Sequence, residues 1–220
     1  MKKTITCIAV LSILIVTITG TAKAQKGLYV GVQGAPQLSV MFNEDDVTAP
    51  GTDYKSKFSY TFGVNAGYNF TKRMGIGTEV MYSTVRQRFE KQGGSYDQHL
   101  SYLKIPVLFT YNSHPDARLV FTAKAGPQVS LLMNSAIKNA DNASMNGDNK
   151  SRYKDIVFGA TAGAGVRFRL TGNMHLTTGL RFDGSFGSIE DGAYNGPNKG
   201  RARTYDLNSG VEVGVKYFLN

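Results

Sequence analysis

Apolar and polar residues alternate with a period of two over most of the chain. Between Phe58 and Phe70 the even-numbered residues are aromatic, Val or Ala, and the odd-numbered residues are Ser, Thr, Gly or Asn. Between Gly210 and Leu219 the odd-numbered residues are apolar and the even-numbered residues are small or charged, with Phe218 as the exception. Successive side chains of a β-strand point to opposite faces, so each segment predicts a strand with one apolar and one polar face.

Eight segments of this kind follow one another along the chain. We expect strands at residues 27–40, 58–70, 74–89, 99–112, 118–133, 155–170, 174–188 and 204–219. Eight strands that close on themselves form a barrel narrow enough for its own side chains to fill. A closed sheet also leaves no unpaired strand edge, which lipid could not hydrogen-bond.

Long and short connections alternate between these segments. The long ones are polar and rich in Asn, Asp, Gly and Lys, at residues 41–57, 90–98, 134–154 and 189–203. The short ones lie around residues 71–73, 112–117 and 171–173. Bacterial outer-membrane barrels have this alternation, with short periplasmic turns and longer external loops. The sequence therefore predicts an all-β fold, an eight-stranded antiparallel up-and-down transmembrane barrel with both ends in the periplasm.

A soluble sandwich or lipocalin-like barrel would also show a period of two, but its apolar residues would face inward. Its solvent-facing side would then carry many Lys and Glu residues. Here the polar positions are mostly Gly, Ser, Thr and Asn, and only 19% of the chain is charged. This composition favours the membrane barrel.

The first 24 residues have the features of a secretory signal peptide. Lys2 and Lys3 precede an apolar run from Ile8 to Ile18, and Ala22-Lys23-Ala24 fits the small-residue cleavage rule. The alternative is a retained anchor, but the run is shorter than the roughly 20 residues that a membrane-spanning helix needs. We expect a cleaved signal peptide at 1–24 and one barrel domain at 25–220.

Cleavage at this site would change both the charge and the cysteine content. The chain has a formal net charge of +9 and one cysteine, Cys7. The mature chain would lose this thiol, and its net charge would fall to +6 with the three lysines of the signal peptide. The chain is basic, but it is expected to be exported and has no basic run with interleaved aromatic residues. We therefore expect its positive charge to face acidic lipid headgroups and not nucleic acid.

Charged residues occupy the polar face of several predicted strands. Alternation directs eight of them into the lumen: Glu79, Lys104, Lys124, Arg167, Arg181, Asp183, Glu212 and Lys216. Buried charges persist when they are paired and hydrogen-bonded, so we expect a charge network that plugs the interior. A path for protons or ions is the alternative.

Two ion-pair arrangements follow from the expected strand register. A turn centred near residue 196 sets Arg181 and Glu212 opposite each other within about one residue, and both face inward. Glu79 is expected between Lys104 and Lys124, where it would separate two cations.

His99 and Ser101 are the candidates for catalysis. They lie two residues apart on one strand face, near the predicted external rim. This pair resembles the arrangement of outer-membrane lipid A deacylases, in which His activates Ser for acyl transfer. Only Glu90 is an obvious orienting acid, so no catalytic set is complete and we expect no enzyme.

The sequence predicts no metal and no cofactor. The three histidines, His99, His114 and His175, have no metal-ligand spacing. Gly163-Ala164-Gly165 continues into a strand and not into a helix, so it is no nucleotide-binding fingerprint.

Four tyrosines lie in or beside the predicted external connections. Tyr54, Tyr96, Tyr153 and Tyr194 are candidates for contact with a partner. For Tyr54 and Tyr153, which lie near strand ends, an interfacial aromatic girdle explains the position equally well.

The segment Tyr102-Leu103-Lys104-Ile105-Pro106, followed by Tyr111, resembles the Tyr-Leu-x-Ile-Pro strand of the PorT-like outer-membrane β-barrel domain of Bacteroidota. Lys104 stands where that family more often has an acid, and the chain ends in Leu219-Asn220 instead of an aromatic residue. The resemblance implies an outer-membrane barrel without shared catalytic residues. Some members of the family are linked to protein secretion.

These observations predict a small barrel of the cell outer membrane with a side-chain-filled interior. Its role would be structural or partner-binding through the external loops, as an accessory to secretion or envelope assembly. The expected partners are outer-membrane lipid, lipopolysaccharide and an envelope or secretion protein, with no nucleic acid, and the barrel is expected to be a monomer. An outer-leaflet lipid A deacylase and a narrow ion channel are the alternatives.

Overall fold

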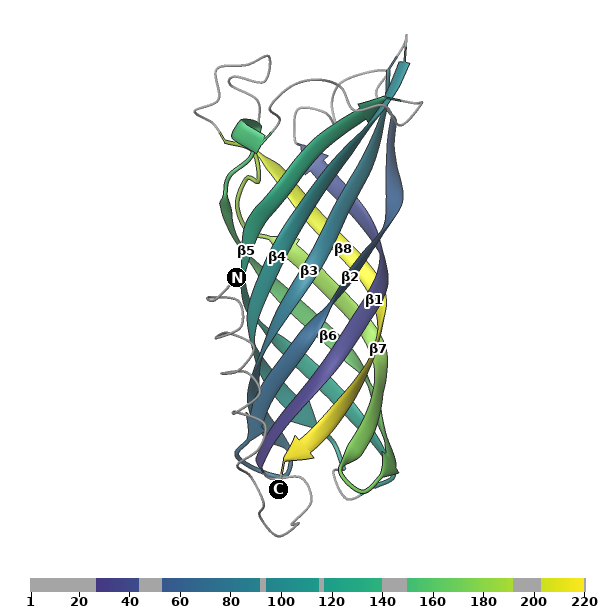
Figure 1. Ribbon diagram of the computed structural model, residues 1–220, viewed down its shortest axis with the longest axis vertical. Helices are drawn as coiled ribbons and strands as arrows, with labels where there is room; N and C mark the ends of the chain where they lie inside the picture. The colour runs from purple at the N-terminus through teal and green to yellow at the C-terminus, as the bar shows by residue number, and fades with distance from the viewer. Residues whose placement is uncertain are drawn as a thin grey trace, which may run out of the picture.

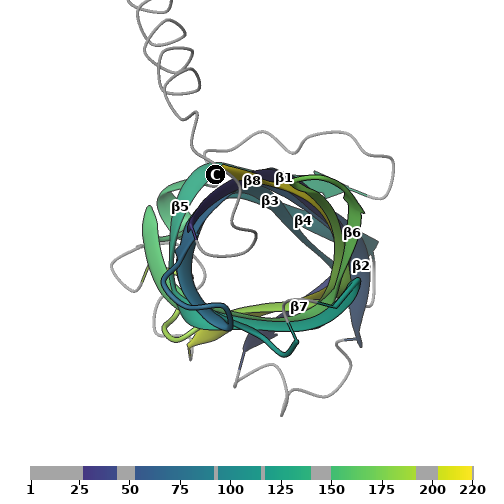
Figure 2. The same cartoon turned by 90° about the horizontal axis from the view of Figure 1, so that it is seen from below.

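The computed structural model is a closed barrel of eight antiparallel strands (Figures 1 and 2). It describes residues 27–43, 53–91, 94–114, 117–139, 150–191 and 203–219. The elements are β1 (Gly27–Asn43), β2 (Asp53–Asn69), β3 (Met74–Lys91), β4 (Gly94–Asn112), β5 (Leu119–Asn139), the 3-10 helix η1 (Lys150–Arg152), β6 (Ile156–Thr171), β7 (Met174–Ser185) and β8 (Thr204–Leu219). The predicted fold class is confirmed.

The barrel closes between its first and last strands. β1 pairs with β8 in antiparallel register from Leu28 opposite Leu219 to Asn43 opposite Thr204. Every other strand pairs with its neighbours in chain order, as expected of an up-and-down barrel. The short turns therefore gather at one end and the longer connections at the other, with the C-terminal end of β8 at the short-turn end (Figure 1). The predicted signal peptide lies outside the described residues.

Strands β1 to β5 extend further toward the long-connection end than the alternation predicts, whereas β7 ends at Ser185, before the expected residue 188. The expected connection at 90–98 is wrong, because β3 and β4 continue as a ladder until Lys91 pairs with Gly94. β2 begins at Asp53 and β5 ends at Asn139, so parts of two other expected connections are also strand. Beyond the lipid, a hairpin needs only its backbone hydrogen bonds, and apolar alternation is no longer required.

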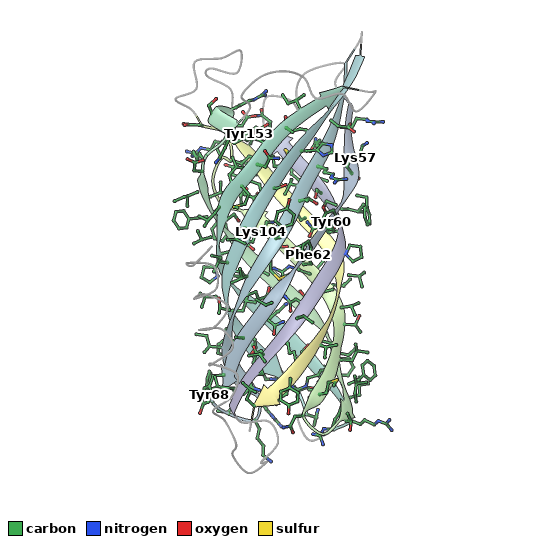
Figure 3. All side chains as sticks on the ribbon, in the orientation of Figure 1. Lys57, Tyr60, Phe62, Tyr68, Lys104 and Tyr153 are labelled. Atoms are coloured by element: carbon green, nitrogen blue, oxygen red, sulfur yellow. The ribbon has the colours of Figure 1, made fainter. Side chains whose placement is uncertain are left out.

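Apolar side chains face outward and polar side chains face the lumen. Tyr60, Phe62 and Tyr68 of β2 are exposed on the outer wall (Figure 3). Phe58 of the same strand is 62% exposed. The alternate positions of β2 turn inward and are small or polar. The barrel thus has the inverted polarity of a membrane protein, with an apolar belt around a polar interior.

Small residues let the strands curve tightly around this interior. A Cβ added at Gly63 would overlap the carbonyl oxygen of Val80, and one added at Gly126 would overlap that of Val107. Close backbone approach therefore requires glycine at both positions. No helix in the described ranges has the length and apolarity needed to cross a membrane.

Candidate functional site

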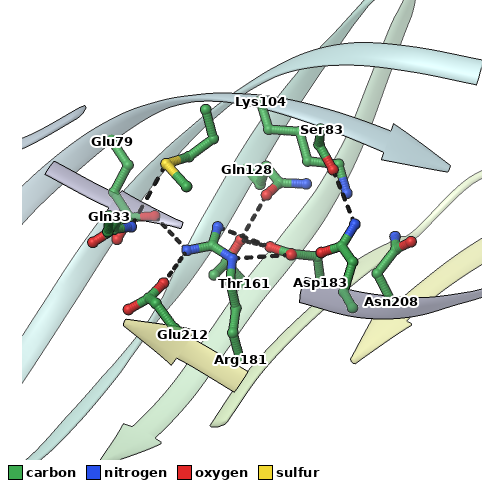
Figure 4. Close-up of polar contacts among 12 residues, drawn as sticks. Gln33, Glu79, Ser83, Lys104, Gln128, Thr161, Arg181, Asp183, Asn208 and Glu212 are labelled. Carbon is green, nitrogen blue, oxygen red and sulfur yellow. Dashed lines mark hydrogen bonds and ion pairs between the residues drawn. The ribbon is translucent and has the colours of Figure 1, made fainter. Parts of the chain in front are cut away.

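An ion-pair network occupies the middle of the lumen, and Arg181 of β7 lies at its centre (Figure 4). Its Nη1 donates to Glu79 Oε2 at 2.6 Å and to Glu212 Oε2 at 2.9 Å. Its Nε and Nη2 donate to the two oxygens of Asp183, each at 3.0 Å. Only 1% of Arg181 is exposed, so these charge-assisted bonds replace the water that the guanidinium loses.

Lys124 of β5 shares two of these carboxylates from the other side. Its Nζ donates to Glu79 Oε1 at 2.8 Å and to Glu212 Oε1 at 2.7 Å. Two cations and two glutamates therefore alternate across the lumen, and they come from β3, β5, β7 and β8. Side chains of non-adjacent strands are held together, so the network braces the barrel across its width.

A neutral hydrogen-bond chain continues from Asp183 toward the wall. The Thr161 hydroxyl lies 2.7 Å from Asp183 Oδ1 and 2.6 Å from Gln128 Oε1 (Figure 4). Gln128 Nε2 in turn donates to Ser130 Oγ at 3.1 Å. Thr161 of β6 thus contacts the buried Asp183 and links it to Gln128 and Ser130 of β5.

The expected ion pair of Arg181 and Glu212 is present, but in a different register. Arg181 lies opposite Gly210, and Glu212 lies opposite Gly179. The two charged residues are therefore diagonal neighbours on the inner face, within reach because both side chains are long. The expected direct opposition was wrong by two residues.

Lys104 does not join Glu79, which corrects that part of the expectation. Lys104 lies opposite Met81, two residues from Glu79 toward the long-connection end. Its Nζ is 3.8 Å from Asp206 Oδ2 of β8. The two lysines are thus in different layers of the lumen, and only Lys124 reaches Glu79.

An apolar cluster closes the lumen beyond Lys104. Its members are inward side chains of five strands together with Tyr153 and Ile189 from the connections: Met41, Val85, Leu100, Tyr102, Leu132, Tyr153, Val157 and Ile189. The cluster and the ion-pair network obstruct the interior at two levels. Side chains therefore occupy the lumen at both levels.

Tyr153 belongs to this cluster and not to an exposed contact surface. It is 5% exposed, and its backbone pairs with Glu190 in an isolated bridge. Its proposed role as a contact residue is therefore wrong, because the segment before β6 folds over the barrel opening. The side chains of Tyr54 and Tyr96 and all of Tyr194 lie outside the described residues.

A cavity of about 50 Å³ remains at the short-turn end of the lumen. Arg167 of β6 and Lys216 of β8 line it. The Arg167 guanidinium carbon is 5.2 Å from the centre of the Phe218 ring, and Lys216 Nζ is 4.7 Å from that of Tyr29. Both expected lumen cations therefore face inward, but they stand apart from the central network.

The candidate catalytic pair lies on the outer wall. Ser101 Oγ accepts a hydrogen bond from the Tyr82 hydroxyl at 3.0 Å, and His99 lies opposite Arg86 of β3. Glu90 pairs through its backbone with Ser95, and its side chain lies outside the described part. Among the described residues no three His, Cys, Asp or Glu side chains are grouped for a metal ion.

Charged residues that the sequence reasoning missed follow the outer apolar belt at the long-connection end. Asp97 Oδ2 is 2.9 Å from Lys57 Nζ, and Asp97 Oδ1 is 2.8 Å from Arg88 Nε. The Arg86 guanidinium carbon lies 5.8 Å from the centre of the Tyr60 ring on the outer face. We call Lys57, Arg86 and Arg88 the outer basic patch. The sequence does contain a signal for this patch. Basic residues occupy the alternate positions 86 and 88, after the outward apolar residues of the same strand end.

Comparisons with solved structures support the fold. Neisserial surface protein A is 13% identical, with 87% of this chain and 97% of that chain covered and a TM-score of 0.51. OprG of Pseudomonas aeruginosa is 12% identical, with 88% and 96% covered and a TM-score of 0.53. No curated protein matches the chain.

A family model settles the classification. The model of the outer membrane protein β-barrel domain matches residues 22–191, which is more than half of the chain. The match agrees with the closed eight-stranded sheet and its outward apolar belt, and it locates the protein in the outer membrane. The chain therefore belongs to the outer membrane protein β-barrel domain family.

Proposed function

We propose that the protein is a non-conducting barrel that binds an envelope or secretion partner at its long-connection end. The closed lumen is the observation that carries this proposal. Arg181, Glu79, Glu212 and Lys124 cross-link the middle of the interior with bonds of 2.6–2.9 Å. Eight-stranded barrels also lack the width of conducting porins. Specific recognition is then left to the surfaces outside the lumen.

The long-connection end is built as a firm support for such recognition. β4 and β5 contain 19 and 21 residues, whereas a membrane-spanning strand needs about 9–11. The strands therefore continue beyond the lipid. Tyr153 and Ile189 pack into the barrel opening and anchor the connections before β6 and β8. A rigid rim lowers the entropy cost of ordering a binding surface.

The PorT-like resemblance is part of this proposal. Its segment forms the middle of β4, where Tyr102 and Lys104 face the lumen and Leu103 and Ile105 alternate with them. The Pro106 carbonyl accepts a hydrogen bond from the Thr78 hydroxyl at 3.0 Å. These contacts give the segment a structural role in the wall, and a link to secretion would be carried by the connections.

We also infer that phosphate groups of lipopolysaccharide contact the outer basic patch. Lys57, Arg86 and Arg88 lie on the long-connection side of the belt residues Tyr60 and Tyr82, where the outward apolar positions of β3 end. Asp97 neutralises one of their three charges. The surplus positive charge beside tyrosines is suited to an anionic membrane surface.

Trimming one connection tests the partner proposal. Residues 140–149 would be replaced by a short Gly-Ser linker, and a photo-crosslinker would be placed at Lys150 in both forms. We expect one discrete crosslinked product in whole cells with the native connection and its loss after trimming. A matched control trims residues 193–199 and keeps the same crosslinker.

Folding of each form would be checked by outer-membrane fractionation and heat-modifiable migration in gels. An unchanged crosslinked product after trimming at 140–149 would contradict binding at that connection. Discrete conductance steps from the purified native barrel in planar bilayers would contradict a closed lumen.

A further inference from the structure

The positive and negative charges of the lumen do not balance along its axis. Among the described residues, four carboxylates face inward at the centre of the lumen or closer to the long-connection end: Glu79, Asp183, Asp206 and Glu212. Arg181 and Lys124 bind three of them, and Lys104 is the ion-pair partner of the fourth. Arg167 and Lys216, at the short-turn end, form no ion pair at contact distance with a carboxylate in the described part of the chain.

Arg167 is buried, and part of its guanidinium forms no hydrogen bond with the described residues. It is 3% exposed, and its Nε and Nη2 have no acceptor among the described residues. Contact with the Phe218 ring stabilises one face of the guanidinium but does not satisfy its N–H groups. A buried cation with unpaired donors is costly, so a ligand that accepts these hydrogen bonds would stabilise it.

The cavity at this end is lined with further polar groups. Arg167, Lys216, Thr177 and Asn69 border it, together with the small residues Gly163, Gly165 and Gly179. The glycines leave the space open. Glu212 also borders the cavity, but both its oxygens accept bonds from Lys124. The volume of about 50 Å³ exceeds the roughly 10–15 Å³ that one water needs on the same measure.

We propose that this cavity binds a small inorganic anion, of the size of chloride or phosphate, between Arg167 and Lys216. A guanidinium and an ammonium supply opposite charge, and the guanidinium presents paired N–H donors to the ligand. The anion balances the surplus charge of the short-turn end. This site is independent of the partner binding proposed above.

NMR of arginine side chains in the purified barrel gives a direct test. The barrel in detergent micelles would be titrated with sodium chloride and, separately, with sodium phosphate, each replacing sodium gluconate at constant ionic strength. We expect the Arg167 Nε–H resonance to shift and saturate with at least one of the two anions. The Arg181 Nε–H resonance should stay in place, because it is already bonded to Asp183.

Variants connect this response to the site. An anion bound in the cavity should raise the urea midpoint of unfolding of the native barrel, and this rise should disappear in Arg167→Gln. Arg73→Gln makes an equal charge change on an exposed turn and should keep the rise. If Arg167→Gln does not fold, Lys216→Gln should weaken the saturation at Arg167 about ten-fold. The inference is overturned if neither anion gives saturation, if Arg181 shifts equally, or if Arg167→Gln or Lys216→Gln retains the full response.

Discussion

At the scale of single residues, the lumen is organised by charges that have more than one partner. Arg181 bonds to Glu79, Asp183 and Glu212, and Lys124 bonds to both glutamates again. Buried ion pairs of this kind are not a strong source of stability in themselves, because desolvation offsets much of the attraction. Their effect appears when one member is removed.

We expect Arg181→Leu to lower the free energy of unfolding by about 3–5 kcal/mol, because three carboxylates would lose a buried partner. Urea titration of the refolded barrel in micelles would measure the change. Arg73→Leu on the exposed turn is the control and should stay within about 0.5 kcal/mol of the native protein. Equal unfolding midpoints for Arg181→Leu and the native barrel would show that the network is not formed.

Ser101 allows a second test at this scale. We expect Ser101→Ala to leave the acylation of lipid A unchanged, because Ser101 Oγ lies on the outer wall and accepts a hydrogen bond from the Tyr82 hydroxyl there. Mass spectrometry of lipid A from cells with the native and the variant barrel would measure acylation. A deacylated species that disappears with Ser101→Ala would instead identify an enzyme.

At the scale of the elements, β2, β3 and β4 divide into a lipid-facing part and a part beyond it. On β3 the outward apolar positions end at Tyr82, and Arg86 and Arg88 follow. A register shift in β2 between Ser56 and Thr61 accompanies this change and brings Lys57 beside Asp97. The shift accompanies the placement of this lysine beside Asp97 of β4, and β2 and β3 together present the basic patch.

Removal of charge from this patch should reduce the amount of lipopolysaccharide that remains bound during purification. The double variant Lys57→Gln and Arg86→Gln leaves the Arg88–Asp97 pair intact. Phosphate analysis of the purified barrel would measure the bound lipid, and the effect should diminish in high salt because the contact is electrostatic. Lys72→Gln with Arg73→Gln, at the opposite end, is the matched control and should retain native amounts.

At the scale of the whole molecule, closure and polarity determine how the barrel is placed in the membrane. All eight strands pair on both sides, so no backbone edge faces lipid. The short turns lie at one end, and the cluster around Tyr153 closes the other. The barrel therefore has two different ends, and only one of them can face the cell exterior.

We expect the long connections to face outward. A cysteine at Asn142 should react with a membrane-impermeant thiol reagent on intact cells, whereas one at Asn173, in the turn between β6 and β7, should react only after the outer membrane is opened. Cys7 lies in the predicted signal peptide, so it need not be replaced if that peptide is cleaved. N-terminal sequencing that begins at Gln25 would verify the cleavage. Labelling of Asn173 on intact cells would reverse the orientation.

The sequence by itself determined the fold class and the face of nearly every strand residue. Each strand has one face toward lipid and one toward the polar lumen, so apolar and polar residues alternate along it with a period of two. This alternation can be seen in the sequence without knowledge of any tertiary contact. The same alternation correctly directed Glu79, Arg181 and Glu212 into the lumen. Where lipid no longer constrains the strands, at 90–98, the alternation fades, and the ladder of β3 and β4 could not be anticipated.

Only the tertiary structure decided which inward charges meet. Alternation specifies the face of a side chain but not its height along the barrel axis, and that height depends on the register accumulated around eight strands. Thus Lys124 reaches Glu79 while Lys104 lies beside Asp206, and Arg167 is left beside a cavity. The burial of Tyr153 likewise depends on how its segment folds over the opening, because side chains from distant parts of the chain create the apolar surroundings there.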